Sequence, residues 1–216
     1  MDWRCDQLSE RERYRLLVNT VLPRPIALVT TCDGLGRVNT APFSFFNVMG
    51  SEPPVVALGL EHDPHSPDGL KDTTRNILAG GQFVVNLISA SMARAMNICG
   101  IPYPPDQAEH PDAGLDLAPS RQVRPPRIAQ SPVQFECRLH TALDLGPLRH
   151  IVIGEIVHLH CSDRILTPEG RIDMDAYDPI GRLHGSDWYL GLQGRFQSEK
   201  YTQYPGPGAH DTAGTP

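Results

Sequence analysis

The fold is decided by residues 22–60, LPRPIALVTTCDGLGRVNTAPFSFFNVMGSEPPVVALGL. Residues 26–31 are apolar and rich in β-branched side chains, which is typical of a strand. Residues 33–36 contain two glycines and an aspartate and predict a turn, after which residues 37–41 return as the second strand of a hairpin. Another apolar strand follows Pro53 and Pro54. The segment therefore indicates a β-rich, antiparallel fold.

The returning strand leads into a polar and aromatic stretch, residues 40–47, that a plain hairpin does not need. We expect a loop here, and loops held on rigid strands often carry a functional site. Its hydroxyls, amide and backbone N–H groups could meet the polar edge of a flat ring, while its aromatic side chains form a wall. The alternative is that Phe43, Phe45 and Phe46 are ordinary core residues.

Length and composition limit the class of protein. The chain has 216 residues, 40% of them hydrophobic, which is enough for one substantial core. The net charge of -6 argues against a basic nucleic-acid-binding face. The 5 cysteines include no Cys-x-x-Cys pair. Their odd number and the absence of a secretion signal or a transmembrane-length apolar stretch predict a cytoplasmic protein with reduced thiols.

Further elements follow from local patterns. Ser9 and Glu12 form a capping-box pattern ahead of apolar residues at helical spacing, which predicts a helix over residues 10–21. A second, short helix is expected at 72–78, ended by Gly80 and Gly81, and a third at 92–98, which Ser89 or Ser91 could cap. The expected strands are a buried one at 83–88 and two long ones at 133–145 and 151–161. Residues 201–216 are expected to be a disordered tail.

Two stretches allow competing interpretations. Residues 100–126 form a long proline-rich loop, which is either a functional lid or a plain surface excursion. His158 and His160 lie two residues apart on one strand face, where they could bind a metal, but a solvated strand face is the better interpretation. No residue is assigned as a metal ligand.

Two cationic groups are candidates for binding an anion. Lys71, Asp72 and Thr73 open a helix, whose first N–H groups and dipole favour a phosphate. The alternative is that Asp72 simply caps the helix. Arg24 lies between two prolines, so its side chain is placed with little entropy loss. It could reach a phosphate or the electron-rich edge of a flat ring, or it could be an ordinary surface arginine.

The chain resembles the flavin reductase-like family, the FMN-binding split-barrel proteins, over about residues 22–196. The resemblance rests on the segments 24–27, 33–34, 39–47 and 53–54, on 71–77, 83–87, 123–137 and 153–158, and on the late turn at residues 179–185. In that turn His184 stands where the family usually has a second glycine. This departure puts an imidazole near the expected site.

The resemblance implies a mainly β fold, an antiparallel split β-barrel with a few short helices. It also implies a homodimer that binds FMN near its interface and uses NADH or NADPH as co-substrate. The chemistry is hydride transfer from nicotinamide to flavin N5, which the cofactor carries, so no catalytic side chain is assigned. The expected cofactor-binding residues are Arg24, Thr40, Ala41, Pro42, Phe43, Ser44, Phe45, Asn47, Lys71, Asp72, Thr73 and His184.

Residues 1–21 are expected to form an N-terminal helical segment and residues 22–200 the split-barrel domain. The predicted function is NAD(P)H-dependent flavin reduction, in some relatives with delivery of reduced flavin to a partner monooxygenase. A non-catalytic FMN-binding electron-transfer protein is the alternative, and a metal-dependent β-barrel enzyme built on His158 and His160 is a remote one. The loop at 100–126 and His184 are both expected to border the open face of the flavin.

Overall fold

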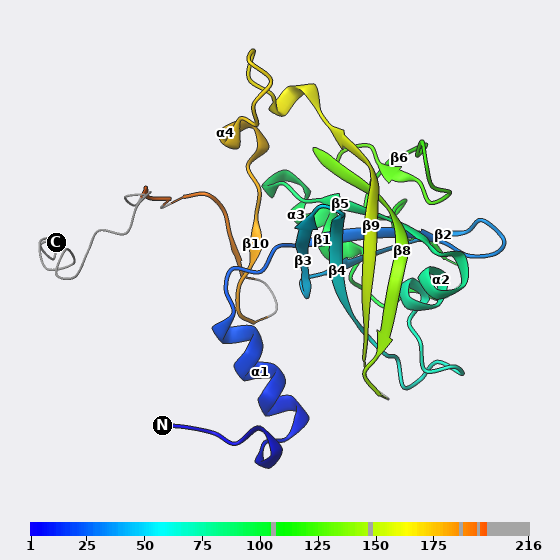
Figure 1. The fold of residues 1–216 in the computed structure, drawn as a ribbon, viewed down its shortest axis with the longest axis vertical. Helices are drawn as coiled ribbons and strands as arrows, with labels where there is room; N and C mark the ends of the chain where they lie inside the picture. The colour runs from blue at the N-terminus through cyan, green and yellow to red at the C-terminus, as the bar shows by residue number, and fades with distance from the viewer. Residues whose placement is uncertain (105–106, 147–148, 186–187, 194, 198–216) are drawn as a thin grey trace, which may run out of the picture.

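A seven-stranded antiparallel sheet forms the centre of the molecule, in the order β2-β1-β5-β8-β9-β4-β3 (Figure 1). The computed structural model describes residues 1–104, 107–146, 149–185, 188–193 and 195–197. The sheet strands are β1 (Ala27–Cys32), β2 (Val38–Phe43), β3 (Phe46–Ser51), β4 (Pro54–Glu61), β5 (Gln82–Leu87), β8 (Val133–Asp144) and β9 (Arg149–Cys161). Two short pairs are β6 (Leu117–Ala118) with β7 (Arg127–Ile128), and β10 (Gly181–Arg182) with β11 (Tyr189–Leu190).

The helices are short. They are α1 (Glu10–Thr20), α2 (Asp72–Gly80), α3 (Ala93–Ile98) and α4 (Met174–Tyr177), with 3-10 turns η1 (Cys5–Gln7), η2 (Ala90–Met92) and η3 (Asp163–Ile165). Helix α1 projects away from the barrel, while α2 lies against its other side (Figure 1). None of the helices in the described residues is long and apolar enough to cross a membrane.

The predicted hairpin is confirmed. Strand β1 pairs with β2 from Ala27 opposite Phe43 to Cys32 opposite Val38. The predicted loop at residues 40–47 is wrong for most of its length. Strand β2 keeps its pairing with β1 through Phe43, and β3 starts pairing with β4 at Phe46, so Ser44 and Phe45 alone connect the two strands.

The core consists of two apolar clusters. The larger one fills the barrel and includes Leu58, Leu60, Phe83 and Val152, all fully buried. A Cβ added at Gly154 would lie 2.3 Å from the ring of Phe83, so this glycine lets the ring pack directly on the backbone of β9. The second cluster joins β1 to α3 and the segment that follows it.

The capping box of α1 is confirmed. The Ser9 hydroxyl accepts a hydrogen bond from the Glu12 N–H, and the Glu12 carboxylate accepts one from the Ser9 N–H. Only Val18 of the apolar stripe is buried, however; Tyr14 and Leu17 are 51% and 58% exposed. The predicted helix at 92–98 is confirmed as α3, but the hydroxyls of Ser89 and Ser91 bond to each other and cap neither α3 nor η2.

The simple alternation predicted for residues 133–145 is only partly correct. Strand β8 has register shifts after Glu136 and after Leu139, which move later side chains to other faces. Leu143 is 48% exposed, whereas Gln134 and Glu136 are buried. The polar face expected at the start of β8, at Gln134 and Glu136, is therefore covered.

The covering segment is the long loop at 100–126, and it is held at several points. The Glu109 carboxylate accepts a hydrogen bond of 2.8 Å from the Thr40 N–H. Leu115 packs in the second apolar cluster, and the N–H groups of Arg121 and Gln122 donate to Glu136. These anchors favour a fixed cover for the sheet over a mobile lid. The predicted tail at 201–216 lies outside the described residues, and the predicted boundaries at 21/22 and 200/201 stay predictions.

Candidate functional site

A cavity of about 820 Å³ lies between α1, α3, the connection from β2 to β3, and the β10–β11 pair. Five of the residues predicted from the sequence line it: Arg24, Pro42, Phe43, Ser44 and His184. Two segments far apart in the chain, residues 42–44 and the late turn at 182–185, thus meet around one space. The cavity is large enough for a fused-ring cofactor.

Arg24 forms one wall of this cavity. It is only 7% exposed, and its guanidinium donates to the carbonyls of Val18, Val21 and Leu183 at 2.5, 3.2 and 3.0 Å. Its Nε lies 3.3 Å from the Ser44 hydroxyl. These bonds tie α1, the β2–β3 connection and the late turn together, so Arg24 positions the wall. A direct contact with flavin or phosphate stays a prediction.

The late turn supplies aromatic and cationic side chains. The guanidinium of Arg182 lies over the ring of Tyr189 at 4.9 Å and also bonds its hydroxyl, which in turn donates to Asn97 at 2.6 Å. His184 is exposed, and its ring stacks on Trp188 with centroids 5.9 Å apart. The His184 imidazole therefore lines the cavity at its exposed rim, and its contact with flavin stays a prediction.

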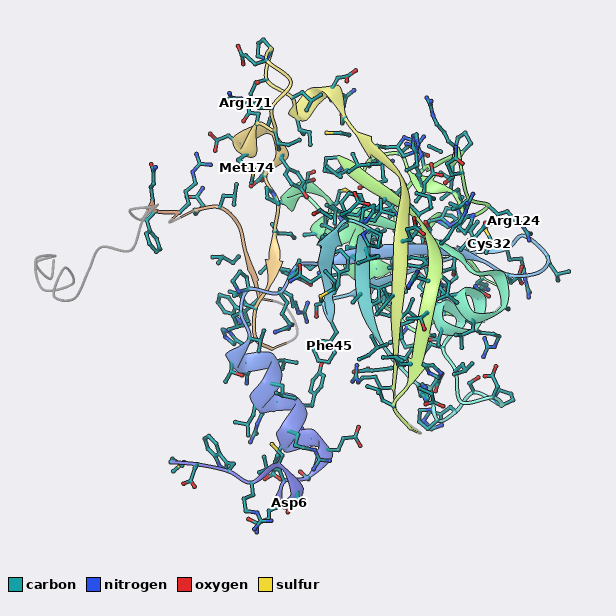
Figure 2. The ribbon with its side chains drawn as sticks, viewed as in Figure 1. Asp6, Cys32, Phe45, Arg124, Arg171 and Met174 are labelled. Carbon is teal, nitrogen blue, oxygen red and sulfur yellow. The ribbon has the colours of Figure 1, made fainter. Side chains whose placement is uncertain are left out.

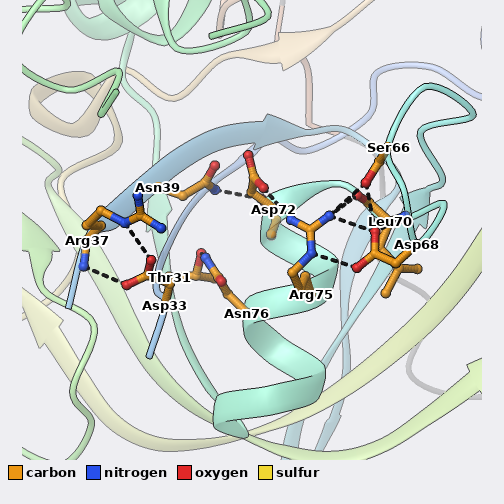
Figure 3. A network of polar contacts seen from close by, with 11 residues as sticks. Thr31, Asp33, Arg37, Asn39, Ser66, Asp68, Leu70, Asp72, Arg75 and Asn76 are labelled. Carbon is orange, nitrogen blue, oxygen red and sulfur yellow. Dashed lines mark hydrogen bonds and ion pairs between the residues drawn. The ribbon is translucent and has the colours of Figure 1, made fainter. Parts of the chain in front are cut away.

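The residues that open α2 lie outside this cavity. Lys71 is the N-cap of α2 and makes no side-chain capping bond, so the alternative in which Asp72 caps the helix is wrong. The Asp72 carboxylate instead bonds Arg75 at 2.5 Å, and Asn39 of β2 donates to the Thr73 hydroxyl at 2.8 Å (Figure 3). Among the described residues, the first N–H groups of α2 have no side-chain acceptor.

A line of contacts on the outer face of the barrel joins the cavity to Lys71. The Tyr14 ring at the cavity lies 6.4 Å from the ring of Phe45, which Figure 2 shows between α1 and the barrel. The Arg149 guanidinium lies 4.9 Å from the centroid of Phe45 and bonds Glu61 at 3.0 Å. Glu61 lies 3.8 Å from the Lys71 ammonium. Arg149 was not among the predicted site residues, because no local sequence pattern distinguishes it.

The predicted residues Thr40, Ala41 and Asn47 do not line the large cavity. Thr40 is fully buried, and Ala41 lies in β2 opposite Val29. Asn47 is exposed on β3, where its side chain accepts a hydrogen bond from the Val48 N–H. It borders a second cavity of about 200 Å³, separate from the first.

The solvated strand face expected for His158 and His160 is wrong at His160, while His158 is half-buried with its ring centroid 4.5 Å from that of His160. The His160 side chain is only 14% exposed, and its Nε2 lies 2.6 Å from a carboxylate oxygen of Glu136, which is fully buried. Burial raises the pKa of Glu136, but the N–H donors of Arg121 and Gln122 together with His160 outweigh it, so the pKa lies below its ordinary value. Burial lowers the pKa of His160. This pair anchors the covering loop.

Known proteins share this fold. A family model for the flavin reductase like domain matches residues 19–173. The structure of 2-nitrobenzoate 2-nitroreductase from Pseudomonas fluorescens superposes with a TM-score of 0.85 at 34% identity, over 96% of this chain and 100% of that one. Nitrilotriacetate monooxygenase component B from Bacillus cereus gives a TM-score of 0.84 at 30% identity, over 92% and 98%.

A Shewanella frigidimarina protein with a split barrel domain, 22% identical over 95% of this chain and 98% of its own, matches with a TM-score of 0.73 and shows the shared fold. The fold is therefore the antiparallel split barrel predicted from the sequence. The chain belongs to the flavin reductase-like family.

The pair Glu136–His160 predicts a loss of stability in acid. Folding lowers the pKa of both groups. The unfolded chain therefore binds more protons than the folded chain below pH 6.5, the ordinary pKa of His160, and again below pH 4.5, that of Glu136, so the free energy of unfolding falls as pH falls. Glu136→Gln should lower the free energy of unfolding by about 1.5–3 kcal/mol at pH 7, because an amide cannot accept from both N–H donors. We expect the difference from wild type to shrink below pH 4.5.

Urea denaturation at neutral and acid pH measures this difference. Glu155→Gln, at an exposed position of β9, is the matched control and should follow the wild-type curve. A gap between Glu136→Gln and wild type that is equally large at both pH values would contradict the assignment.

Proposed function

We propose that the protein binds FMN and uses NADH or NADPH to reduce it, as a flavin reductase. When bound, FMN would supply the chemistry by accepting a hydride from the nicotinamide at N5. The observation that carries the proposal is the meeting of residues 42–44 and the turn at 182–185 around one cavity of about 820 Å³. Membership of a family of flavoprotein oxidoreductases supports it.

The cavity fits the flavin ring. Phe43, Tyr14 and Tyr189 offer apolar and aromatic surface, and Ser44 and Asn97 offer polar groups for the ring edge. Arg24 holds the wall in place before the ligand arrives, which lowers the ordering cost of binding. These residues bind and orient the ring, and no side-chain acid or base is assigned to the hydride step.

The phosphate is proposed to lie at the start of α2, beside Lys71. The helix has no side-chain cap, and the charge of Asp72 is paired with Arg75. Strand β2 runs from Asn39 beside Thr73 to Phe43 at the cavity, a rise of about 13 Å, so an elongated nucleotide could span both. Arg149, whose Nη1 is buried without a hydrogen-bond partner among the described residues, lies beside this path.

The nicotinamide nucleotide is proposed to enter from the side of α1. Arg11 and Arg15 line the cavity from this helix. Their charges would attract the phosphates of the co-substrate. His184 at the rim would contact the same ligand.

Delivery of reduced flavin to a partner monooxygenase is a further part of the proposal. It is supported by the likeness to nitrilotriacetate monooxygenase component B. A cytoplasmic location is also proposed, and the five unpaired cysteines are compatible with it.

Oxidation of NADH and of NADPH by the purified protein, with and without added FMN, tests the proposed activity. We expect loss of nicotinamide absorbance that depends on both the protein and FMN. His184→Gly should change the Michaelis constant for the nicotinamide nucleotide while FMN stays bound. FMN binding without any oxidation of either nucleotide would instead indicate an electron-transfer protein.

Lys71→Ala should weaken FMN binding by about 1.5–3 kcal/mol, because the phosphate loses a charge-assisted hydrogen bond. Flavin fluorescence titration gives the dissociation constant. Arg37→Ala is the matched control, since Arg37 is an exposed cation whose carboxylate partner is Asp33. An unchanged constant in Lys71→Ala would place the phosphate elsewhere.

A homodimer is the proposed assembly. Exposed apolar side chains on α1 (Leu17, 58%), directly after it (Val21, 61%) and on β3 (Met49, 61%) support it, because a monomer would leave them in water. Light scattering at micromolar concentration should give twice the chain mass of 23.8 kDa. The mass of a single chain would contradict this assembly.

A further inference from the structure

Three potential metal ligands meet at the end of the barrel where β4 and β8 end and β9 begins. The His62 Nε2 and the His150 Nδ1 lie 2.5 Å apart, and their ring centroids are 4.7 Å apart. The ligand atoms of His62, His150 and Asp144 all lie within 4.8 Å of one another. Asp144 and His150 lie six residues apart at the end of β8 and the start of β9, whereas His62 is distant in the sequence, so no local spacing motif joins all three.

The strand register explains why these side chains converge. Leu58 pairs with Val152 and Leu60 pairs with His150, and the leucines and Val152 are fully buried core residues. Side chains two residues apart share a face of a strand, so His150 continues the inward row of β9, and His62 follows Leu60 in the inward row of β4. Asp144 pairs directly with His150 across β8 and β9.

The same alternation keeps the neighbouring charges on the other face. Arg149 and Glu61 pair with each other in the register, and their side chains form the ion pair on the outer surface beside Phe45. The inner face therefore ends in two imidazoles and a carboxylate where the apolar core stops. Asp144 is oriented locally, since its Oδ1 accepts a hydrogen bond of 2.9 Å from the Gly146 N–H.

We infer that His62, His150 and Asp144 form a binding site for a divalent transition-metal ion of the zinc class. Imidazole and carboxylate are ligands that Zn²⁺ uses, at about 2.0–2.2 Å, and three protein ligands leave one position for water. Two nitrogens on one tetrahedral zinc lie about 3.3 Å apart. The two imidazoles would separate by less than 1 Å from the 2.5 Å seen here.

A bound ion would join the ends of three strands. At this end β9 is joined to β4 by the strand register, by the Arg149–Glu61 ion pair and by the contact of His150 with His62. Coordination would also tie Asp144 of β8 to the segment after β4, and binding to the folded chain alone would raise its stability. This inference is independent of flavin binding, because it concerns other residues and is measured without a nicotinamide nucleotide.

Calorimetric titration of the full-length protein with Zn²⁺, after removal of metals with a chelator, tests the site. We expect one ion per chain, a higher thermal midpoint with Zn²⁺, and no such effect from Mg²⁺, which prefers oxygen ligands. Titration with Co²⁺ should give the visible absorption of a tetrahedral nitrogen and oxygen site. A thiolate-to-cobalt band would instead place the metal on a cysteine and overturn the proposal.

Asp144→Asn and His62→Ala should each weaken Zn²⁺ binding at least about tenfold, the lower end of what loss of even an indirect partner costs. Asp144 is exposed, so its variant should fold, and circular dichroism checks this. His65→Ala, at an exposed histidine in the same loop as His62, is the matched control. No zinc binding by wild type, or equal affinity in all variants, would show a hydrogen-bonded histidine pair only.

Discussion

The bonds of the Arg24 guanidinium hold together the parts of the molecule that surround the large cavity. One side chain reaches the last turn of α1, the β2–β3 connection and the carbonyl of Leu183 in the late turn. A backbone bridge between Arg24 and Arg182 adds to the same junction. A buried guanidinium is stable only when its donors are satisfied, and here carbonyl oxygens satisfy them. The cavity wall therefore depends on a residue that belongs to none of the strands.

Strand β2 links the two proposed ends of the flavin site. At Asn39 it contacts α2, and at Phe43 it reaches the cavity. Because β2 is paired with β1 along its whole length, both ends are placed by one rigid element. The outer-face contacts from Tyr14 through Phe45 and Arg149 to Glu61 give a second connection over the neighbouring strands.

Local chemistry made much of the fold predictable. The Asp33 turn, the Ser9 capping box and the glycine after α2 each depend on neighbours in sequence, and each is found as predicted. The burial of Glu136 was not predictable, because the residues that cover it belong to the loop at 100–126, whose path no local sequence pattern describes. The register shifts in β8 had the same consequence for Leu143, since one extra residue moves a side chain to the other face.

The candidate site divides in the same way. Residues 42–44 and His184 were predicted from motifs, and they line one cavity in the structure. Arg149 was identified only from its contact with the Phe45 ring. The direct flavin contacts of Arg24 and Lys71 stay predictions. Contacts between distant strands depend on tertiary packing, which residue patterns do not encode one by one.

The weak attachment of α1 has a consequence for the cavity it borders. The helix buries one side chain, Val18, and is otherwise held at its last turn by Arg24 and at Tyr14 by a ring contact with Phe45. A short helix with so little buried surface opens at a small cost in free energy compared with the paired strands. The wall of the cavity that α1 forms therefore opens at a lower cost in free energy than the walls formed by the paired strands. A bulky ligand could be admitted by local unfolding of residues 10–20 while the barrel keeps its shape.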